Sequence, residues 1–198
     1  MYFFSFLYIV RMSIIRLFFV LTLFLFHSCN NSNKISKPNI VLFMVDDLGW
    51  QDTSVSFWKS ETKFNRLYNT PNMEILADMG VKFTNAYATP VCSPSRISLM
   101  TGMNAAKHRV TNWTLNPNKK KPAEINHKNF EFPDWNYNGL STLDSVSNSI
   151  YATPLPQVLK DNGYFTIHAG KAHLGAIGYP SSNPLNIGFD VNIAGHAA

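Results

Sequence analysis

Three short runs of apolar and strand-forming residues divide the chain, and each run ends at polar residues. Within residues 39–45 (NIVLFMV), the chain is continuously apolar from Ile40 and stops at two aspartates, which is typical of a strand buried on both faces of a parallel sheet. Residues 81–87 (VKFTNAY) and 164–169 (YFTIHA) follow a similar plan. We therefore predict three strands, each of which leads into a loop.

Apolar residues recur at helical spacing in the segments that separate these strands. One helix is predicted to open at Thr70-Pro71 and to end at Gly80, and another to open at Thr153-Pro154 and to end at Gly163. Proline suits the first turn of a helix, and glycine suits the position just beyond its end. Strands that alternate with helices predict an α/β fold, with a doubly wound, mostly parallel sheet flanked by helices.

A long polar stretch, roughly residues 111–151, interrupts this alternation. It carries Trp113, Trp135 and Tyr137 among many asparagine, serine and proline residues. A loop of this length in a compact domain is usually functional or mobile. The aromatic rings could stack on sugar rings, or they could pin the loop to the core. The sequence leaves both interpretations open.

The N-terminus has the layout of an export signal. Arg11 and Arg16 precede the apolar run 17–26, which is shorter than the stretch of about 20 apolar residues that spans a membrane. Ser28-Cys29 follows and resembles the bacterial lipoprotein signal, in which the chain is cut before a cysteine that is then acylated. Met12 is an alternative start, and an uncleaved N-terminal anchor is an alternative interpretation.

These features divide the chain into three parts. We expect residues 1–28 to be a lipoprotein-type signal peptide and residues 29–37 to be a polar tether, followed by a folded domain over residues 38–198. Lipidation of Cys29 would anchor the protein to a membrane. The expected location is therefore outside the cytoplasm, as a periplasmic or cell-surface lipoprotein of a bacterium.

Composition and charge narrow the choice of function. Of the 198 residues, 45% are hydrophobic and 15% are charged, so the bulk of the chain is expected to fold. Removal of residues 1–28 takes two of the 17 basic residues and none of the 12 acidic ones, leaving a net charge of +3. This modest charge does not predict nucleic acid as a partner. With only two cysteines, lipidation of Cys29 would leave Cys92 without a disulfide partner.

Residues that can do chemistry follow the predicted strands. Asp46 and Asp47 come directly after the first strand, Cys92 follows the second, and Lys171 and His173 follow the third. The carboxyl ends of parallel strands form the binding crevice of an open α/β sheet, so these side chains are expected to meet. Paired carboxylates suit a hard cation such as calcium, although such a pair also commonly caps a turn.

The segment 92–102 (CSPSRISLMTG) predicts a third helix with an anion site at its start. Pro94 suits the first turn, and Gly102 lies where the helix should end. Cys92 would then lie beside free backbone N–H groups and the positive end of the helix dipole. Arg96, one turn further on, adds a fixed positive charge and several hydrogen-bond donors.

Four motifs follow one another along the chain: PNIVLFMVDDLGW at 38–50, TPNMEILA at 70–77, CSPSRISLMTG at 92–102 and GKAHLG at 170–175. In this order they resemble the motifs of the sulfatase family, with Ala172 where tryptophan is common in the last motif. The resemblance runs from Pro38 to the end of the chain and implies the alkaline-phosphatase-like fold.

The resemblance implies that Cys92 is oxidised after translation to formylglycine (3-oxoalanine), whose hydrate attacks the sulfur of a sulfate ester. Arg96 would stabilise this group, and His173 would hydrogen-bond its hydroxyls. Lys171 would bind the sulfate of the substrate. The implied partners include a formylglycine-generating maturation enzyme and a sulfated small molecule or glycan.

The resemblance further implies a calcium ion bound by Asp46, Asp47 and the formylglycine made from Cys92. The expected activity is that of a sulfuric ester hydrolase acting on an alcohol-linked, carbohydrate substrate. Members of the family are longer, so we expect this chain to be a fragment, incomplete at the C-terminus of its α/β domain and with little turnover. A phosphate or phosphonate ester hydrolase of the same fold and an inactive, lipid-anchored binding module remain alternatives.

Overall fold

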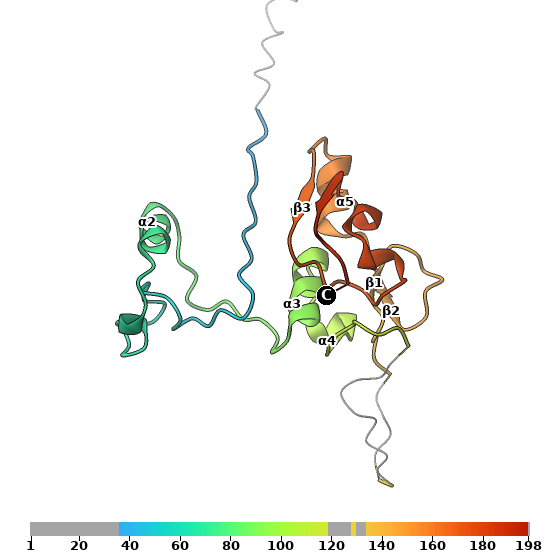
Figure 1. The fold of residues 1–198 in the computed structure, drawn as a ribbon, viewed down its shortest axis with the longest axis horizontal. Coiled ribbons are helices and arrows are strands. Elements are labelled where there is room, and N and C mark those ends of the chain that lie inside the picture. The colour runs from blue at the N-terminus through green and yellow to red at the C-terminus, as the bar shows by residue number, and fades with distance from the viewer. Residues whose placement is uncertain (1–35, 119–127, 130–133, 198) are drawn as a thin grey trace, which may run out of the picture. The chain divides into compact units, whose positions relative to one another are not determined.

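The computed structural model describes residues 36–118, 128–129 and 134–197 (Figure 1). Contacts divide the chain into two units, Met1–Met44 and Val45–Ala198. The predicted signal peptide and Cys29 lie outside the described residues. No helix in the part of the chain that the structure describes is both long and apolar enough to cross a membrane.

The prediction of a buried strand over residues 39–45 is wrong for this structure. The segment carries no regular secondary structure, and its side chains are exposed, Val41 to 88% and Phe43 to 85%. A strand exists through hydrogen bonds to a neighbouring strand, and no described residue pairs with this one. The predicted strand over 81–87 is wrong for the same reason, and Val81 is 80% exposed.

Helices account for most of the regular structure of the second unit. The predicted helix after Thr70 is confirmed as α2, and the predicted helix after Pro154 is confirmed as α5. Thr70 occupies the N-cap position of α2, but its hydroxyl bonds Ser54 rather than the backbone of the helix. The helices are α2 (Pro71–Met79), α3 (Cys92–Thr101), α4 (Ala105–His108) and α5 (Leu155–Asp161), with short 3-10 turns η2 (Asn65–Leu67), η3 (Pro180–Ser182) and η4 (Pro184–Ile187).

The described strands form two parallel pairs. β1 (Gly139–Ser141) pairs with β2 (Ser149–Tyr151), and β3 (Ile167–Ala169) pairs with β4 (Val191–Ile193). Parallel strand pairs together with the α-helices confirm the α/β class, and β3 lies within the third predicted strand. The first pair falls in the stretch that was expected to be a loop, so that part of the prediction is wrong.

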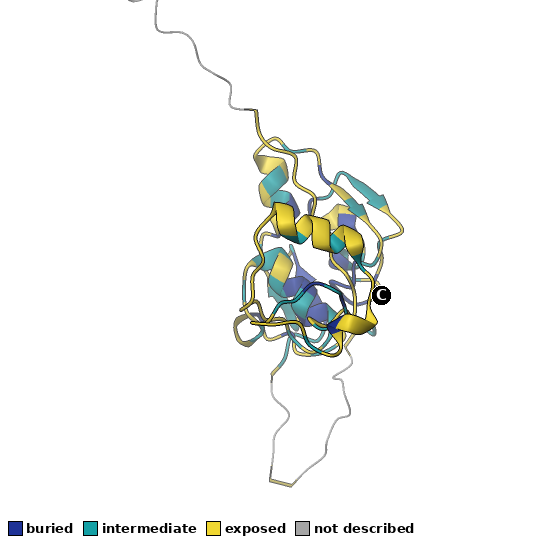
Figure 2. Ribbon diagram, turned by 90° about the vertical axis from the view of Figure 1, so that its left-hand side faces the viewer, coloured by how far each residue is buried: buried dark blue, intermediate teal, exposed yellow. Residues whose placement is uncertain are grey.

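The hydrophobic core of the second unit gathers around α3. Figure 2 shows the buried segments in dark blue, and α2 contains no buried residue. Ile97 on α3 is fully buried, as its place on the apolar face of the predicted helix requires. The core cluster consists of Ile97, Val110, Leu140, Leu174 and Ile187.

The aromatic residues of the long polar stretch differ in exposure. Trp113 is 54% exposed, whereas Trp135 and Tyr137 are half-buried. Part of the stretch is held by a reciprocal amide pair, in which Asn138 Nδ2 donates to Asn118 Oδ1 and Asn118 N–H donates to Asn138 Oδ1. Half-burial supports a packing role for Trp135 and Tyr137. For Trp113, both interpretations remain: stacking on a sugar and packing of the loop against the core.

Candidate active site

Helix α3 carries Cys92 as its first residue, as the position of Pro94 led us to expect. The chain enters the helix through Val91, which has an extended backbone and offers no capping side chain. The hydroxyl of Ser95 accepts a hydrogen bond from the backbone N–H of Thr89 at 3.1 Å and so fixes the incoming chain. The first N–H groups of a helix are not used within it, so the backbone beside Cys92 is suited to an anion.

Helix α3 is also held at its other end. The backbone N–H of Val110 donates to His108 Nδ1 at 3.0 Å, so the ring proton lies on Nε2, which lies 2.9 Å from Ser98 Oγ. His108 is completely buried, and this burial lowers its pKa. The sequence predicts His108 to be a helix-end or surface residue. It is the last residue of α4, but it is buried, and a lone histidine carries no local signal of the contacts that it will make.

Arg96 links α3 to two other segments of the site. Its NH1 donates to the backbone carbonyl of Lys171 at 2.6 Å, and its NH2 donates to Asp46 Oδ1 at 3.2 Å. The residue is only 8% exposed. Its Nε has no hydrogen-bond partner among the residues that the structure describes. Arg96 therefore holds the backbone of one motif and the carboxylate of another against the helix.

Lys171 completes a compact group of charges. Its Nζ donates to Asp46 Oδ2 at 2.7 Å and to Cys92 Sγ at 3.3 Å. The hydrogen bond from Lys171, assisted by Arg96, lowers the pKa of Asp46, and the same bond raises the pKa of Lys171. Three residues that are distant in the sequence thus meet at one point, with a cation beside the sulfur.

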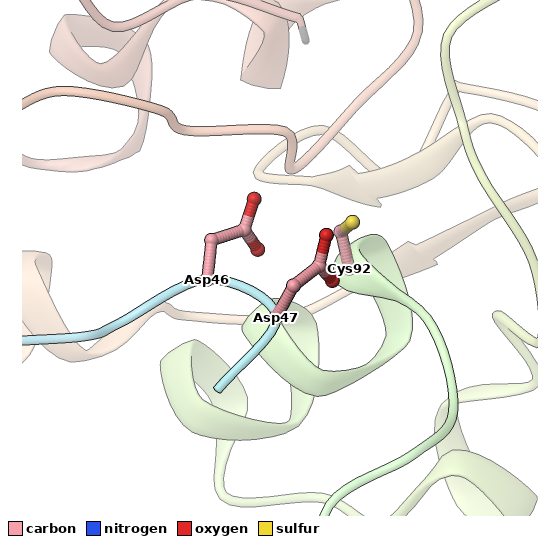
Figure 3. Close-up of side chains that lie close together, drawn as sticks. All are labelled: Asp46, Asp47 and Cys92. Atoms are coloured by element: carbon pink, nitrogen blue, oxygen red, sulfur yellow. The ribbon is translucent and has the colours of Figure 1, made fainter. Parts of the chain in front are cut away.

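Asp47 lies next to this group. One ligand atom each from Asp46, Asp47 and Cys92 fall within 4.8 Å of one another (Figure 3). Both aspartates are exposed and Cys92 is half-buried. Asp47 has a φ of 54°, a left-handed conformation that few residues other than glycine adopt. The turn at the end of residues 39–45 thereby brings both carboxylates near the start of α3.

His173, two residues after Lys171, is buried, with 6% exposure. Neither ring nitrogen has a hydrogen-bond partner among the described residues. Burial lowers the pKa of His173 to about 4, and the positive charges of Lys171 and Arg96 act in the same direction. The imidazole is therefore neutral at pH 7, with one nitrogen able to accept a proton or a hydrogen bond.

Acid is expected to destabilise the protein through His173. The unfolded chain binds a proton at this residue below about pH 6.5, whereas the native protein does so only below about 4. The contribution of the neutral, buried His173 to the free energy of unfolding is therefore fully present above pH 6.5, and it falls by about 2–3 kcal/mol as the pH drops to 4. Urea denaturation at about pH 7 and about pH 4.5 measures the loss, which His173→Gln should reduce.

Burial also lowers the pKa values of His108 and His168, so the variant should lessen this loss of stability without removing it. An unchanged dependence on pH in His173→Gln would contradict the prediction.

The structure also brings in a segment that the sequence did not mark. The backbone N–H of His173 donates to the carbonyl of His196 at 3.0 Å, which places residues 194–196 beside the site. The contact depends on the pairing of β3 with β4, and a pairing between strands separated in sequence has no local signal.

Comparison with known proteins gives, along most of the chain, the family that the four sequence motifs resemble. A family model described as Sulfatase matches residues 38–197. The N-acetylgalactosamine-6-sulfatase of Mus musculus is 34% identical over 157 residues, which cover 77% of this chain and 24% of that protein. A sulfatase of Formosa agariphila is 34% identical over 160 residues (81% and 27%), and the steryl-sulfatase of Homo sapiens is 32% identical over 179 residues (87% and 25%). The chain thus spans about a quarter of the length of these relatives.

Proposed function

The chain belongs to the sulfatase family, and on this premise we propose that the protein hydrolyses sulfate esters of alcohols. The observation that supports the proposal most directly is the position of Lys171. Its Nζ lies 2.7 Å from Asp46 and 3.3 Å from the sulfur of Cys92. A cation held at the start of a helix, beside the nucleophile's position, suits an anionic ester such as a sulfate.

Asp46, Asp47 and Cys92 fit a calcium ion in the type of ligand that they offer. Carboxylate oxygens are preferred by calcium, and conversion of Cys92 to formylglycine would replace its sulfur by oxygen. The three ligand atoms already lie within 4.8 Å of one another. Calcium takes six to eight ligands, so these residues would hold one side of the ion. When bound, calcium would offset negative charge on the transferring group.

The nucleophile in this proposal is the hydrated aldehyde of formylglycine at position 92, which a maturation enzyme would generate from the thiol. Lys171 would bind an oxygen of the sulfate, which it can reach from its place beside Cys92. Arg96 would hold Asp46 and the Lys171 backbone in register with the start of α3. His173 is neutral and buried, and its unpartnered ring nitrogens would exchange protons or hydrogen bonds with the hydroxyls at position 92.

We propose carbohydrate as the substrate class. Two observations support this: the name of the Mus musculus relative specifies a sulfated amino sugar, and the exposed ring of Trp113 offers a surface on which a sugar could stack. Export as a bacterial lipoprotein, anchored through Cys29, would place the protein where sulfated glycans occur. The signal that predicts this export lies in residues 1–28.

Paired esters test the proposed reaction. The protein, produced together with a formylglycine-generating enzyme, is expected to hydrolyse 4-nitrophenyl sulfate slowly in the presence of calcium, in line with the low turnover expected from the sequence, and to lose that activity when calcium is chelated. It is expected to hydrolyse 4-nitrophenyl phosphate far more slowly. Faster release from the phosphate would favour the phosphate ester hydrolase. Hydrolysis of neither ester by matured protein would favour the inactive binding module.

A further inference from the structure

Three of the six described non-glycine residues with a left-handed backbone lie in segments around the candidate site. Asp47, His173 and Ala194 have φ values of 54°, 50° and 59°, although none is glycine. A left-handed residue of this kind costs about 1–2 kcal/mol, and residues held in such strain cluster at functional sites. Asp47 and His173 belong to the site already described. Ala194 opens a short loop of residues 194–196, which the proposed reaction does not use.

This 194–196 loop is fixed by a double hydrogen bond. Asn192 Nδ2 donates to the carbonyl of Gly195 at 2.9 Å, and the N–H of Gly195 donates to Asn192 Oδ1 at 2.9 Å. A Cβ atom at position 195 would collide with the side chains of Asn192 and His168, which would have to move. The strain at Ala194 is thus held in place by contacts on both sides.

The loop reaches the site through His196. The backbone N–H of His173 donates to the His196 carbonyl at 3.0 Å, and the N–H of Gly170 donates to the carbonyl of Ile193 at 2.9 Å. β3 and β4 are parallel neighbours, so the loops that carry Lys171 and His196 leave the same edge of the sheet. The pKa of His173 is lowered chiefly by burial, then by Lys171 and Arg96, and to a smaller extent by His196. The two histidines are therefore close enough to interact electrostatically.

From this geometry we propose that His196 is a specificity-determining residue, which contacts the hydroxyl-bearing alcohol portion of the substrate. The proposal rests on the proposed sulfatase function. His173 is 6% exposed, whereas His196 is an exposed residue, so His196 lies on the solvent side of its neighbour. The sulfate group would sit at Cys92 and Lys171, and the alcohol must leave toward solvent. An imidazole can both donate to and accept from a sugar hydroxyl.

Binding measurements on the full chain separate the sulfate from the sugar. Inorganic sulfate and N-acetylgalactosamine 6-sulfate are titrated by calorimetry, with calcium present, into the wild type and into His196→Ala. One hydrogen bond to a hydroxyl corresponds to a change in affinity of about 3- to 10-fold. His196→Ala should therefore weaken binding of the sugar sulfate by this factor and leave inorganic sulfate unchanged. The variant retains the backbone carbonyl that His173 uses.

Two further variants serve as controls. His196→Gln keeps a donor and an acceptor and is expected to retain most of the affinity for the sugar. Ile193→Ala, at a 57% exposed position on the same strand, is expected to bind both ligands as the wild type does.

Four outcomes would overturn the inference. In the first, His196→Ala binds both ligands as tightly as the wild type does. In the second, His196→Ala lowers the affinity for both ligands equally, which would mean that His196 affects sulfate binding or the stability of the fold. If the wild type binds the sugar sulfate no more tightly than inorganic sulfate, the inference fails and the proposed function stands. If the wild type binds neither ligand, both fail.

Discussion

Replacement of Cys92 by alanine is expected to abolish sulfate ester hydrolysis by the matured protein, with a loss of at least about a thousandfold. The substitution removes the thiol whose oxidation would give the aldehyde, and Cys92 is the residue whose sulfur lies beside Lys171 at the start of α3. Turnover of 4-nitrophenyl sulfate measures the effect. Binding of inorganic sulfate should persist in the variant, because Lys171 and Arg96 are unchanged.

The mass of the peptide that contains Cys92 provides an independent measurement. Conversion of the thiol to the aldehyde makes the peptide about 18 Da lighter, and the fraction converted should match the fraction of active protein. Cys29→Ala is the matched control, since it removes the other cysteine and should keep turnover per converted molecule. Full turnover by Cys92→Ala would sink the proposed mechanism.

The helices were predictable because their signals are local. Proline at or before the first turn and glycine just beyond the last one are fixed by the conformations of single residues, and α2, α3 and α5 begin and end close to such signals. Gly102 ends α3 in the left-handed conformation that glycine tolerates best.

Strands were harder to predict, for an equally physical reason. Residues 39–45 have strong strand character, yet a strand needs a partner, and the described residues provide none for this run. The short β1 and β2 have weak strand character, but they find each other in the fold, with Leu140 opposite Ile150. Strand pairing depends on contacts between distant segments, so the sequence of one segment cannot settle it.

The candidate site shows the same division between local and distant causes. Asp46, Cys92, Arg96 and Lys171 could be singled out because each follows a predicted strand or begins a helix, and the structure brings all four together. Their chemical roles stay predictions. His196 could not be singled out, because its position depends on how β4 pairs with β3.

Arg96 is the residue whose loss is expected to affect both folding and the site. Arg96→Ala would leave the Lys171 carbonyl without this donor and would remove one of the two cations that pair with Asp46. Hydrogen bonds that involve a charged group each contribute about 1.5–3 kcal/mol. We expect the free energy of unfolding to fall by about 2–4 kcal/mol, measured by denaturation in urea, and inorganic sulfate binding to be lost.

Two comparison variants distinguish this role from a general effect of removing charge. Arg66 is an exposed arginine paired with Glu61 at 3.5 Å, so Arg66→Ala should change the stability by less than about 0.5 kcal/mol. Arg96→Lys keeps the charge but has no planar fork with which to reach the Lys171 carbonyl and Asp46 together, so it should fall between the wild type and Arg96→Ala. If Arg96→Ala were as stable as Arg66→Ala and still bound sulfate, Arg96 would not hold the site together, and the alignment of Asp46 and Lys171 with α3 would need another cause.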